Sequence, residues 1–249
     1  MLSKSRILLY EECPWHYKKR YLEKIQDPPS KAMKRGSLIH KALENFYLDP
    51  RIHPVKEKFL SDNDLENLRK DLMKIGSDQA VRIGGIPESW VNNFVEFNIA
   101  MISSRGDFVP AIQEGYMKNQ ALNLCGIVDR VDCSRKGEWA IIDYKSGKKK
   151  TKLSSSNILE LSIYAMLVQN HFGGEVKYIG IFYADHPYQP QKNPVISILK
   201  PEYIENALGR TAAAQIGISQ SNFPKQPGFY CRWCNLERTI HCEGRFARK

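Results

Sequence analysis

The chain has 249 residues, of which 42% are hydrophobic, and its 37 Lys and Arg residues outnumber 27 Asp and Glu. This length and apolar content suffice for one substantial core with room for a small satellite, and they exclude a disordered chain. The net charge of +10 favours a polyanionic partner, although charge alone does not separate nucleic acid from an anionic membrane surface.

The sequence also limits where the protein works. No apolar run approaches the length that spans a bilayer, and the apolar stretch near Met1 is too short and too soon acidic for a signal peptide. We therefore expect no membrane partner and a cytoplasmic location, or the host cytoplasm if the protein is viral. A disulfide framework is not expected there. Cys125 and Cys133 lie in apolar strand-like runs and are expected to be small buried hydrophobes.

The first part of the chain is expected to be helical. Residues 3–24 predict two short helices, with Ser3 or Ser5 capping the first and Pro14 in the first turn of the second. The DPPS segment at 27–30 predicts a loop. Three further helices are expected at 36–48, 62–75 and 88–103, with a turn at 83–87 between the last two.

The pattern then changes to strands. Three successive strands are expected at 108–118, 121–133 and 138–145, with a turn at 136–138. A helix at 156–171, a strand at 176–184, a short strand at 194–199 and a helix at 201–218 follow, and the tail from 222 is irregular, basic and cysteine-rich. This order predicts a mixed α/β (α+β) fold, in which a central mixed sheet with an antiparallel meander is flanked by helices.

The segment GIVDRVDCSRKGEWAIIDYKSG, residues 126–147, carries the chemically informative residues. Asp129 lies on one expected strand, and Asp143 and Lys145 share a face of the next. The turn between the strands brings the two acids together, where they repel unless a cation lies between them. Oxygen ligands suit Mg²⁺ or Mn²⁺, and a neighbouring lysine can hold an attacking water and stabilise charge on a phosphate.

The alternative is a strand pair with surface salt bridges, Asp129 with Arg130 and Asp143 with Lys145. An isolated D-x-K tripeptide would favour this alternative because it is common by chance. Asp143, however, ends a buried strand, where an unpaired charge is costly, and a second acid lies at hairpin distance. The complete set therefore favours a metal site.

The strings GIVDRVD and IIDYKSG resemble the RecB-type branch of the PD-(D/E)XK nucleases, which includes helicase-linked recombination nucleases and CRISPR-associated adaptation nucleases. SKSRILLYEECPWHYKKRY and RGSLIHKALENFY resemble that family's opening and histidine motifs. The resemblance implies a restriction-endonuclease-like core in which Asp129 and Asp143 bind metal and Lys145 assists the nucleophilic water.

The same resemblance implies further site residues. His40 and Glu114 would complete the metal shell, and Glu114 would also be catalytic. Tyr144 is expected among the metal-binding residues, although its side chain should point into the core. From the residues alone, His40 could equally pack locally on its helix, and Glu114 could be an exposed strand acid. Glu11 and Glu12 fit a solvated helix face better than a metal site.

One position departs from the family pattern. The helix after the DYK strand usually carries Gln-(apolar)-x-x-Tyr, whereas here Glu160 replaces the amide and Tyr164 is kept. Tyr164 is therefore expected to bind substrate. An acid at 160 would repel a phosphate unless it joins the metal or pairs with a lysine.

Four cysteines form a separate pattern. Cys231-x-x-Cys234 with Cys242 nearby is a metal-ligand spacing, and Cys13 lies far upstream. The family resemblance implies that these four hold a [4Fe–4S] cluster, but four thiolates fit structural Zn²⁺ equally well, and His241 or His16 could replace one of them. Such a cluster would join the two ends of the chain and stabilise the fold without taking part in the chemistry.

Nucleic-acid contacts are expected beside the active strand. The KSGKKKTK segment at 145–152 places Lys148, Lys149 and Lys150 where they could track phosphates, although a charge run is usually a solvated loop. The WHYKKRY segment at 15–21 could stack bases, but we favour packing near the cluster for its aromatic residues. No base-reading motif is present, so little sequence specificity is expected.

Together these features predict one nuclease domain over 1–249. Residues 1–35 and 222–249 would form a cluster-stapled cap, 36–105 a helical region and 106–221 the catalytic core. The expected activity is phosphodiester hydrolysis by a metal-dependent DNA nuclease, an exonuclease on single strands or DNA ends, in recombination, repair or replication. A helicase or recombination protein is an expected partner. The alternative is a non-catalytic, metal-stapled nucleic-acid-binding module.

Overall fold

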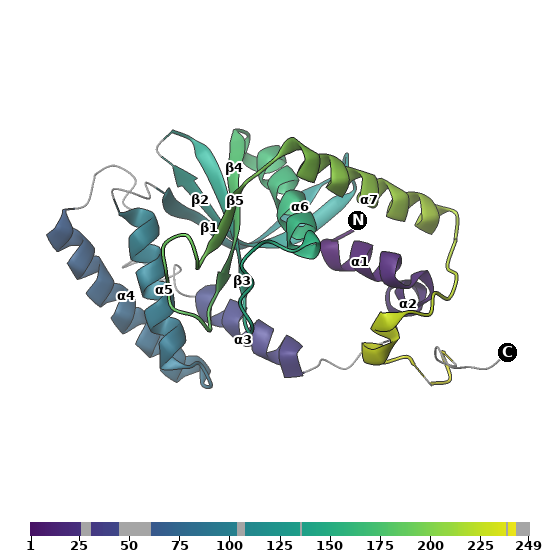
Figure 1. Cartoon of the computed structure of the whole chain (residues 1–249), viewed down its shortest axis with the longest axis horizontal. Coiled ribbons are helices and arrows are strands. Elements are labelled where there is room, and N and C mark those ends of the chain that lie inside the picture. Colours follow the sequence, from purple (N-terminus) through teal and green to yellow (C-terminus); the bar gives the residue numbers. More distant parts are fainter. Residues whose placement is uncertain (26–30, 45–60, 104–107, 135, 238, 243–249) are drawn as a thin grey trace.

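The computed structural model describes residues 1–25, 31–44, 61–103, 108–134, 136–237 and 239–242 (Figure 1). Within them a five-stranded sheet has the order β1-β2-β3-β4-β5. The strands are β1 (Phe108–Asn119), β2 (Leu124–Ser134), β3 (Glu138–Lys145), β4 (Glu175–Tyr183) and β5 (Val195–Ile198). The first three form an antiparallel meander, β4 runs parallel to β3, and β5 runs antiparallel to β4. The predicted mixed sheet is therefore confirmed.

One face of the sheet is covered by α6 (Ser155–Phe172), the helix that connects the parallel strands β3 and β4. A capping box between Ser154 and Asn157 starts this helix, which is buried along most of its length. Its apolar residues pack in one core with Val131, Ile141 and Ile179 of the sheet. The helix α7 (Pro201–Ser219) packs on α6. Because α6 is apolar on nearly all sides, it is stable only between the sheet and α7.

The opposite face of the sheet packs on an aromatic core from a helical pair. The helices are α4 (Asp62–Ile83) and α5 (Glu88–Ile102), which lie together at one end of the molecule (Figure 1). The Phe97 ring stacks on Phe182 of β4, with centroids 4.5 Å apart, and Tyr144 of β3 packs edge-on against Phe94. Burial of these rings attaches the helical pair to the sheet.

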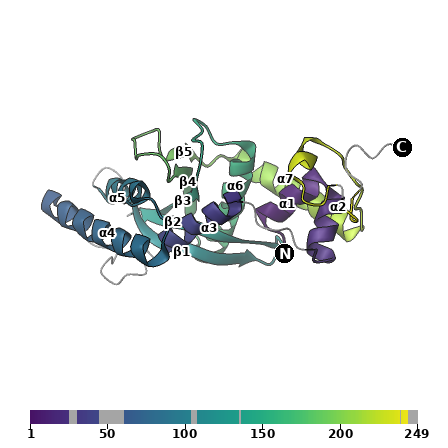
Figure 2. The same ribbon diagram turned by 90° about the horizontal axis from the view of Figure 1, so that it is seen from below.

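The first helices and the last described residues of the chain lie together at the other end of the molecule (Figure 1, Figure 2). Near the N-terminus are α1 (Lys4–Glu12), α2 (Pro14–Tyr17) and a π-helical turn (Lys18–Leu22), and near the C-terminus is a short 3₁₀ helix (Phe229–Trp233). Trp15 donates its main-chain N–H to Pro224 and its indole N–H to the His241 carbonyl. The Tyr17 ring stacks on Phe223, as expected for packing rather than base stacking.

The helix α3 (Lys31–Glu44) lies between these two ends and contacts β1 and β3 (Figure 2). It begins earlier than the predicted 36–48 helix, and α4 continues beyond the predicted end at 75 through the buried Gly76. The predicted loop at 27–30 and the end of the predicted helix after residue 44 lie outside the described residues. Every helix of the described part is too short or too polar to cross a lipid bilayer.

Local details of the prediction need correction. Cys125 and Cys133 are half-buried rather than buried, because the outward-facing positions of β2 are not covered at its ends. Ser3 occupies the N-cap position of α1, but its side chain makes no capping hydrogen bond. Glu11 and Glu12 are exposed, as expected, and Glu11 pairs with Arg210 of α7.

Candidate active site

The site forms where β2 and β3 separate. Their ladder of paired residues ends at Arg130 and Ile142, and beyond it the Asp129 Oδ2 atom accepts a hydrogen bond of 2.8 Å from the main-chain N–H of Tyr144. A side chain thus replaces a main-chain partner at the point of separation, which holds the Asp129 carboxylate beside β3. Asp129 and Asp143 line the same pocket of about 710 Å³.

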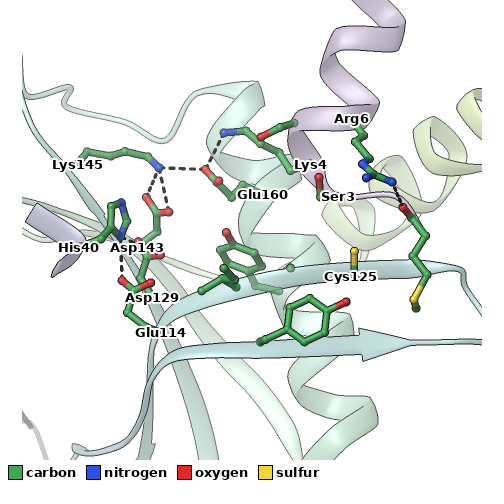
Figure 3. A pocket seen from close by; sticks show the side chains of 16 residues that line it. Ser3, Lys4, Arg6, His40, Glu114, Cys125, Asp129, Asp143, Lys145 and Glu160 are labelled. Carbon is green, nitrogen blue, oxygen red and sulfur yellow. Dashed lines mark hydrogen bonds and ion pairs between the residues drawn. The ribbon is translucent and has the colours of Figure 1, made fainter. Parts of the chain in front are cut away.

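His40 and Glu114 join Asp129 at this point (Figure 3). The His40 Nδ1 atom lies 2.9 Å from Glu114 Oε1 and 3.4 Å from Asp129 Oδ1. One ligand atom from each of the three lies within 4.8 Å of the others. Glu114 adopts a φ of 47°, in the left-handed region that is costly for residues other than glycine and that recurs at functional sites. The histidine therefore faces the acids, and Glu114 is not simply an exposed strand acid.

The second half of the site is a chain of alternating charges (Figure 3). The Lys145 ammonium group lies 2.9 Å from Oδ1 and 2.7 Å from Oδ2 of Asp143. Its other neighbour is Glu160 Oε2 at 3.3 Å, and the same oxygen accepts from Lys4 of α1 at 3.0 Å. Glu160 thus pairs with two lysines and lies outside the group formed by His40, Glu114 and Asp129.

Burial and mutual repulsion shift the protonation of the acids. Burial, together with the charge of Glu114, raises the pKa of Asp129 to about 7. Burial and the charges of Asp129 and Glu160 raise the pKa of Asp143 well above its ordinary value. Burial alone would lower the pKa of Lys145, but the carboxylates of Asp143 and Glu160 raise it above its ordinary value, so Lys145 stays protonated at neutral pH. Buried carboxyl groups that repel one another are stabilised in their charged form by a bound cation.

The residues present fit a divalent metal ion. The two carboxylates match the oxygen-donor preference of Mg²⁺ and Mn²⁺, and the imidazole adds a nitrogen donor that transition ions accept more readily than Mg²⁺ does. The alternative of a surface salt bridge between Asp129 and Arg130 is wrong, because Arg130 is fully buried and pairs instead with Asp132 and Asn98. The phenol of Tyr144 lies in the aromatic core, so only its main chain faces the site.

Comparison with known families identifies the superfamily of the chain. The family model described as the PD-(D/E)XK nuclease superfamily matches residues 1–239. The chain belongs to this superfamily.

Individual relatives are more distant. The chain is 27% identical, over 219 residues, to two proteins named as a subunit of an ATP-dependent helicase/deoxyribonuclease, from Thermoanaerobacter sp. strain X514 and Thermoanaerobacter pseudethanolicus. These alignments cover 73% of this chain but only 19% of each relative. A crystal structure from Eubacterium rectale, provisionally named an exonuclease, has a TM-score of 0.51 and 14% identity, and the match covers 96% of this chain and 88% of that one. This last similarity shows the fold alone.

The raised pKa of Asp129 predicts how this superfamily member responds to pH and metal. The unfolded chain releases the Asp129 proton near pH 3.9, whereas the folded protein keeps it until about pH 7. The unfolded state binds fewer protons between these values, so we expect the metal-free protein to lose stability as the pH rises through about 7. Mg²⁺ or Mn²⁺ should then raise the melting temperature more above pH 7 than below it. Calorimetry of wild type and Asp129→Asn tests this, and a pH dependence as steep in Asp129→Asn as in wild type would contradict it.

Other predicted substrate residues lie in the pocket or on the loop after β3. Tyr164 of α6 lines it, and burial, with the charge of Glu160, raises its pKa further, so the phenol remains a proton donor. A Cβ on Gly126 would lie 2.9 Å from the Tyr164 ring, so only glycine allows α6 to pack this closely. Lys148 and Lys150 are exposed and Lys149 is half-buried, all on the loop that leaves β3. Their contact with phosphates stays a prediction.

The four cysteines gather at the junction of the chain ends. Cys13, Cys231, Cys234 and Cys242 line one small cavity together with His16, whose Nδ1 atom lies 3.5 Å from Cys234 Sγ. Residues separated by more than two hundred positions in the sequence are thus brought together, as the predicted cap requires. Both chain ends supply ligand-type residues to this cavity. The identity of any bound group stays a prediction.

Sequence reasoning missed residues that shape the site. Lys4 lies inside the recognised opening motif, but only the fold brings it to Glu160. Asp185 follows β4 and accepts hydrogen bonds from the indole of Trp90 at 2.7 Å and from the main-chain N–H of Gly147. It also pairs with Arg35 of α3, the helix that carries His40. Asp185 therefore connects the loop after β3, which carries Lys148, Lys149 and Lys150, to α3, which carries His40. Its position after a strand did not predict this role.

Proposed function

We propose that this protein is a metal-dependent deoxyribonuclease of the RecB-type branch, an exonuclease that hydrolyses phosphodiester bonds on single strands or at free ends. The observation that carries the proposal is the meeting of a protonated lysine, Lys145, with the buried acids Asp129 and Asp143 in one open pocket. Membership of the superfamily supports hydrolysis of nucleic acid. The names of the Thermoanaerobacter relatives support DNA as the substrate.

The proposed chemistry divides the work among the residues. His40, Glu114 and Asp129 would hold Mg²⁺ or Mn²⁺, with Asp143 beside them. When bound, such an ion supplies positive charge to the phosphate and lowers the pKa of water. Lys145 donates hydrogen bonds and cannot act as a base at neutral pH, so it orients the attacking water and stabilises charge on the phosphate oxygens. Water adds to phosphorus as one ester oxygen leaves with a proton.

We further propose that the four cysteines of the cap hold a [4Fe–4S] cluster. Cys13, Cys231, Cys234 and Cys242 line one cavity, and four thiolates are the usual ligand set of such a cluster. The alternative is a tetrahedral Zn²⁺ ion held by the same four thiolates. We also propose that the protein acts together with a helicase. This proposal is supported by the names of the Thermoanaerobacter relatives, of whose length this chain covers only 19%.

The replacement of the family glutamine by Glu160 gives a prediction. Burial would raise the pKa of Glu160, but Lys145 and Lys4 hold it below its ordinary value, so it is an anion between two cations. Glu160→Gln removes the negative charge that neutralises Lys145 and Lys4, so both lysines should attract a phosphate more strongly. The KM for DNA should therefore fall several-fold, and binding should depend more steeply on salt. The melting temperature should fall because a buried ion pair loses one partner.

A matched control exists on the same strand as Lys145. Glu138 pairs with Lys177 at 2.6 Å outside the pocket, so Glu138→Gln removes an equal charge without approaching substrate. Its KM should match that of wild type. An unchanged KM in Glu160→Gln, with only stability lowered, would restrict Glu160 to a structural role.

The direct test is a cleavage assay on end-labelled single-stranded DNA, duplex DNA and RNA. Mg²⁺- or Mn²⁺-dependent release of labelled products that stops with a chelator is the expected result. Progressive shortening from one end would support an exonuclease. Tight DNA binding without cleavage in any divalent metal would instead support the non-catalytic, metal-stapled module.

A further inference from the structure

Lys4 contacts the active site from a position that is unfavourable for a cation. It is the first residue of α1, where the positive end of the helix dipole repels positive charge. Within α1 itself nothing compensates, because the first turn contains no acid and the Ser3 side chain makes no capping hydrogen bond. The negative charge beside this helix end comes instead from Glu160 of α6, whose Oε2 atom accepts a hydrogen bond of 3.0 Å from Lys4.

Lys4 and Lys145 share this one oxygen atom of Glu160 (Figure 3). The Nζ atom of Lys145 lies 3.3 Å from Oε2, compared with 3.0 Å for that of Lys4. The Lys4 and Glu160 side chains are only 19% and 9% exposed, so solvent screens this pair little. Glu160 is thus neutralised in part from α1, rather than by Lys145 alone.

The sharing of Glu160 affects what Lys145 can do. An ammonium group has three N–H donors, and Lys145 already directs donors to Asp143. Without Lys4, the buried Glu160 carboxylate would have only Lys145 to stabilise it, and it would draw that ammonium group closer. A further donor of Lys145 would then point away from a phosphate, and the pocket would lose one positive charge. Both changes oppose the binding of an anionic substrate and the stabilisation of its transition state.

We propose that Lys4 is a positioning residue of the nuclease, which pairs with Glu160 and so keeps the Lys145 ammonium group available to the phosphate. The inference rests on the proposed nuclease function and adds to it a residue outside β2 and β3. The pair of Lys4 and Glu160 carries no net charge, like the glutamine that is usual at this position in the family. A neutral amide is thus replaced by an ion pair whose second member comes from the start of α1.

A double-mutant cycle of Lys4 and Glu160 tests this role. In Lys4→Met, kcat for the cleavage of end-labelled DNA should fall roughly 10-fold and KM should rise several-fold. Adding Glu160→Gln should return both constants close to wild type, because the double variant has the same net charge in the pocket as wild type. Lys4→Arg keeps the positive charge and should recover most of the loss. A role confined to packing α1 on α6 predicts no such rescue, because the contact is absent from both Lys4→Met and the double variant.

Arg210→Met controls for loosening of α1. Arg210 of α7 pairs with Glu11 near the other end of α1, outside the pocket. This variant should leave kcat and KM unchanged, whatever its effect on the melting temperature. Wild-type kcat and KM in Lys4→Met, or a double variant as impaired as Lys4→Met, would overturn the inference.

Binding without cleavage separates this inference from the nuclease assignment. Fluorescence anisotropy of a labelled oligothymidine, in a chelator so that no strand is cut, should show weaker binding by Lys4→Met and wild-type binding by the double variant. If wild type cleaved no nucleic acid but gave this binding pattern, the nuclease assignment would fail while the pairing of Lys4 with Glu160 was supported. An affinity that Lys4→Met leaves unchanged would overturn the inference whatever the cleavage assay shows.

Discussion

Replacing Lys145 with methionine is expected to slow DNA cleavage by about two to three orders of magnitude while the protein stays folded. Methionine keeps most of the apolar stem but removes the ammonium group that lies against Asp143 and Glu160. The lost charge is the one placed to stabilise the phosphate, so the loss should appear in kcat. Single-turnover cleavage of end-labelled DNA measures it, and circular dichroism checks the fold.

Lys177 provides the control for this variant. It lies on the adjacent strand β4, is 37% exposed compared with 32% for Lys145, and also pairs with an acid, Glu138. Lys177→Met should cleave DNA at the wild-type rate because Lys177 lies outside the pocket. If Lys145→Met cleaved as fast as Lys177→Met, Lys145 would have no part in the reaction. Asp143→Asn should be at least as damaging as Lys145→Met, because it removes a buried acid that lies beside the proposed metal ligands.

We expect the replacement of Cys231 with serine to remove the iron of the proposed cluster and to cost on the order of several kcal/mol of stability. A cluster that joins Cys13 to the C-terminal cysteines closes a loop of nearly the whole chain, and closure of long loops restricts the unfolded state most. Iron analysis of anaerobically prepared protein and thermal melting measure the two effects. Cys231→Ser should lose the brown colour, and its melting temperature should be lower than that of wild type.

Cys133→Ser is the matched change outside the cap. Cys133 is also half-buried, but it lies on β2 and donates to the Ser134 carbonyl. Cys133→Ser should keep any iron that wild type holds, and its melting temperature should be close to that of wild type. Zinc in place of iron in the wild-type protein would identify the bound group as a zinc site, and wild type with neither metal would contradict the cap proposal. Cleavage per folded molecule should be little changed in Cys231→Ser, because Cys231 and the other three cysteines of the cap lie outside the active-site pocket.

Most of the secondary structure follows from local pattern. The strands β1, β2 and β3 fall close to the predicted 108–118, 121–133 and 138–145, because apolar runs broken by turn residues are a local signal. Helix ends were less accurate, as in α4, which runs past its predicted end because buried Gly76 packs inside the helix instead of ending it. Cys125 and Cys133 were expected to be buried because sequence shows apolar neighbours but not which strand positions a helix covers.

By itself, the sequence determined the superfamily, the strand pair and the side-by-side placement of Asp143 and Lys145, because residues two apart on a strand must share a face. Tertiary structure decided what depends on distant segments meeting. It brought His40 of α3 to Glu114 and Asp129, turned Arg130 away to Asp132, and placed Lys4 against Glu160. The physical reason is that a buried charge is tolerated only beside its partner, and that partner can come from any part of the chain.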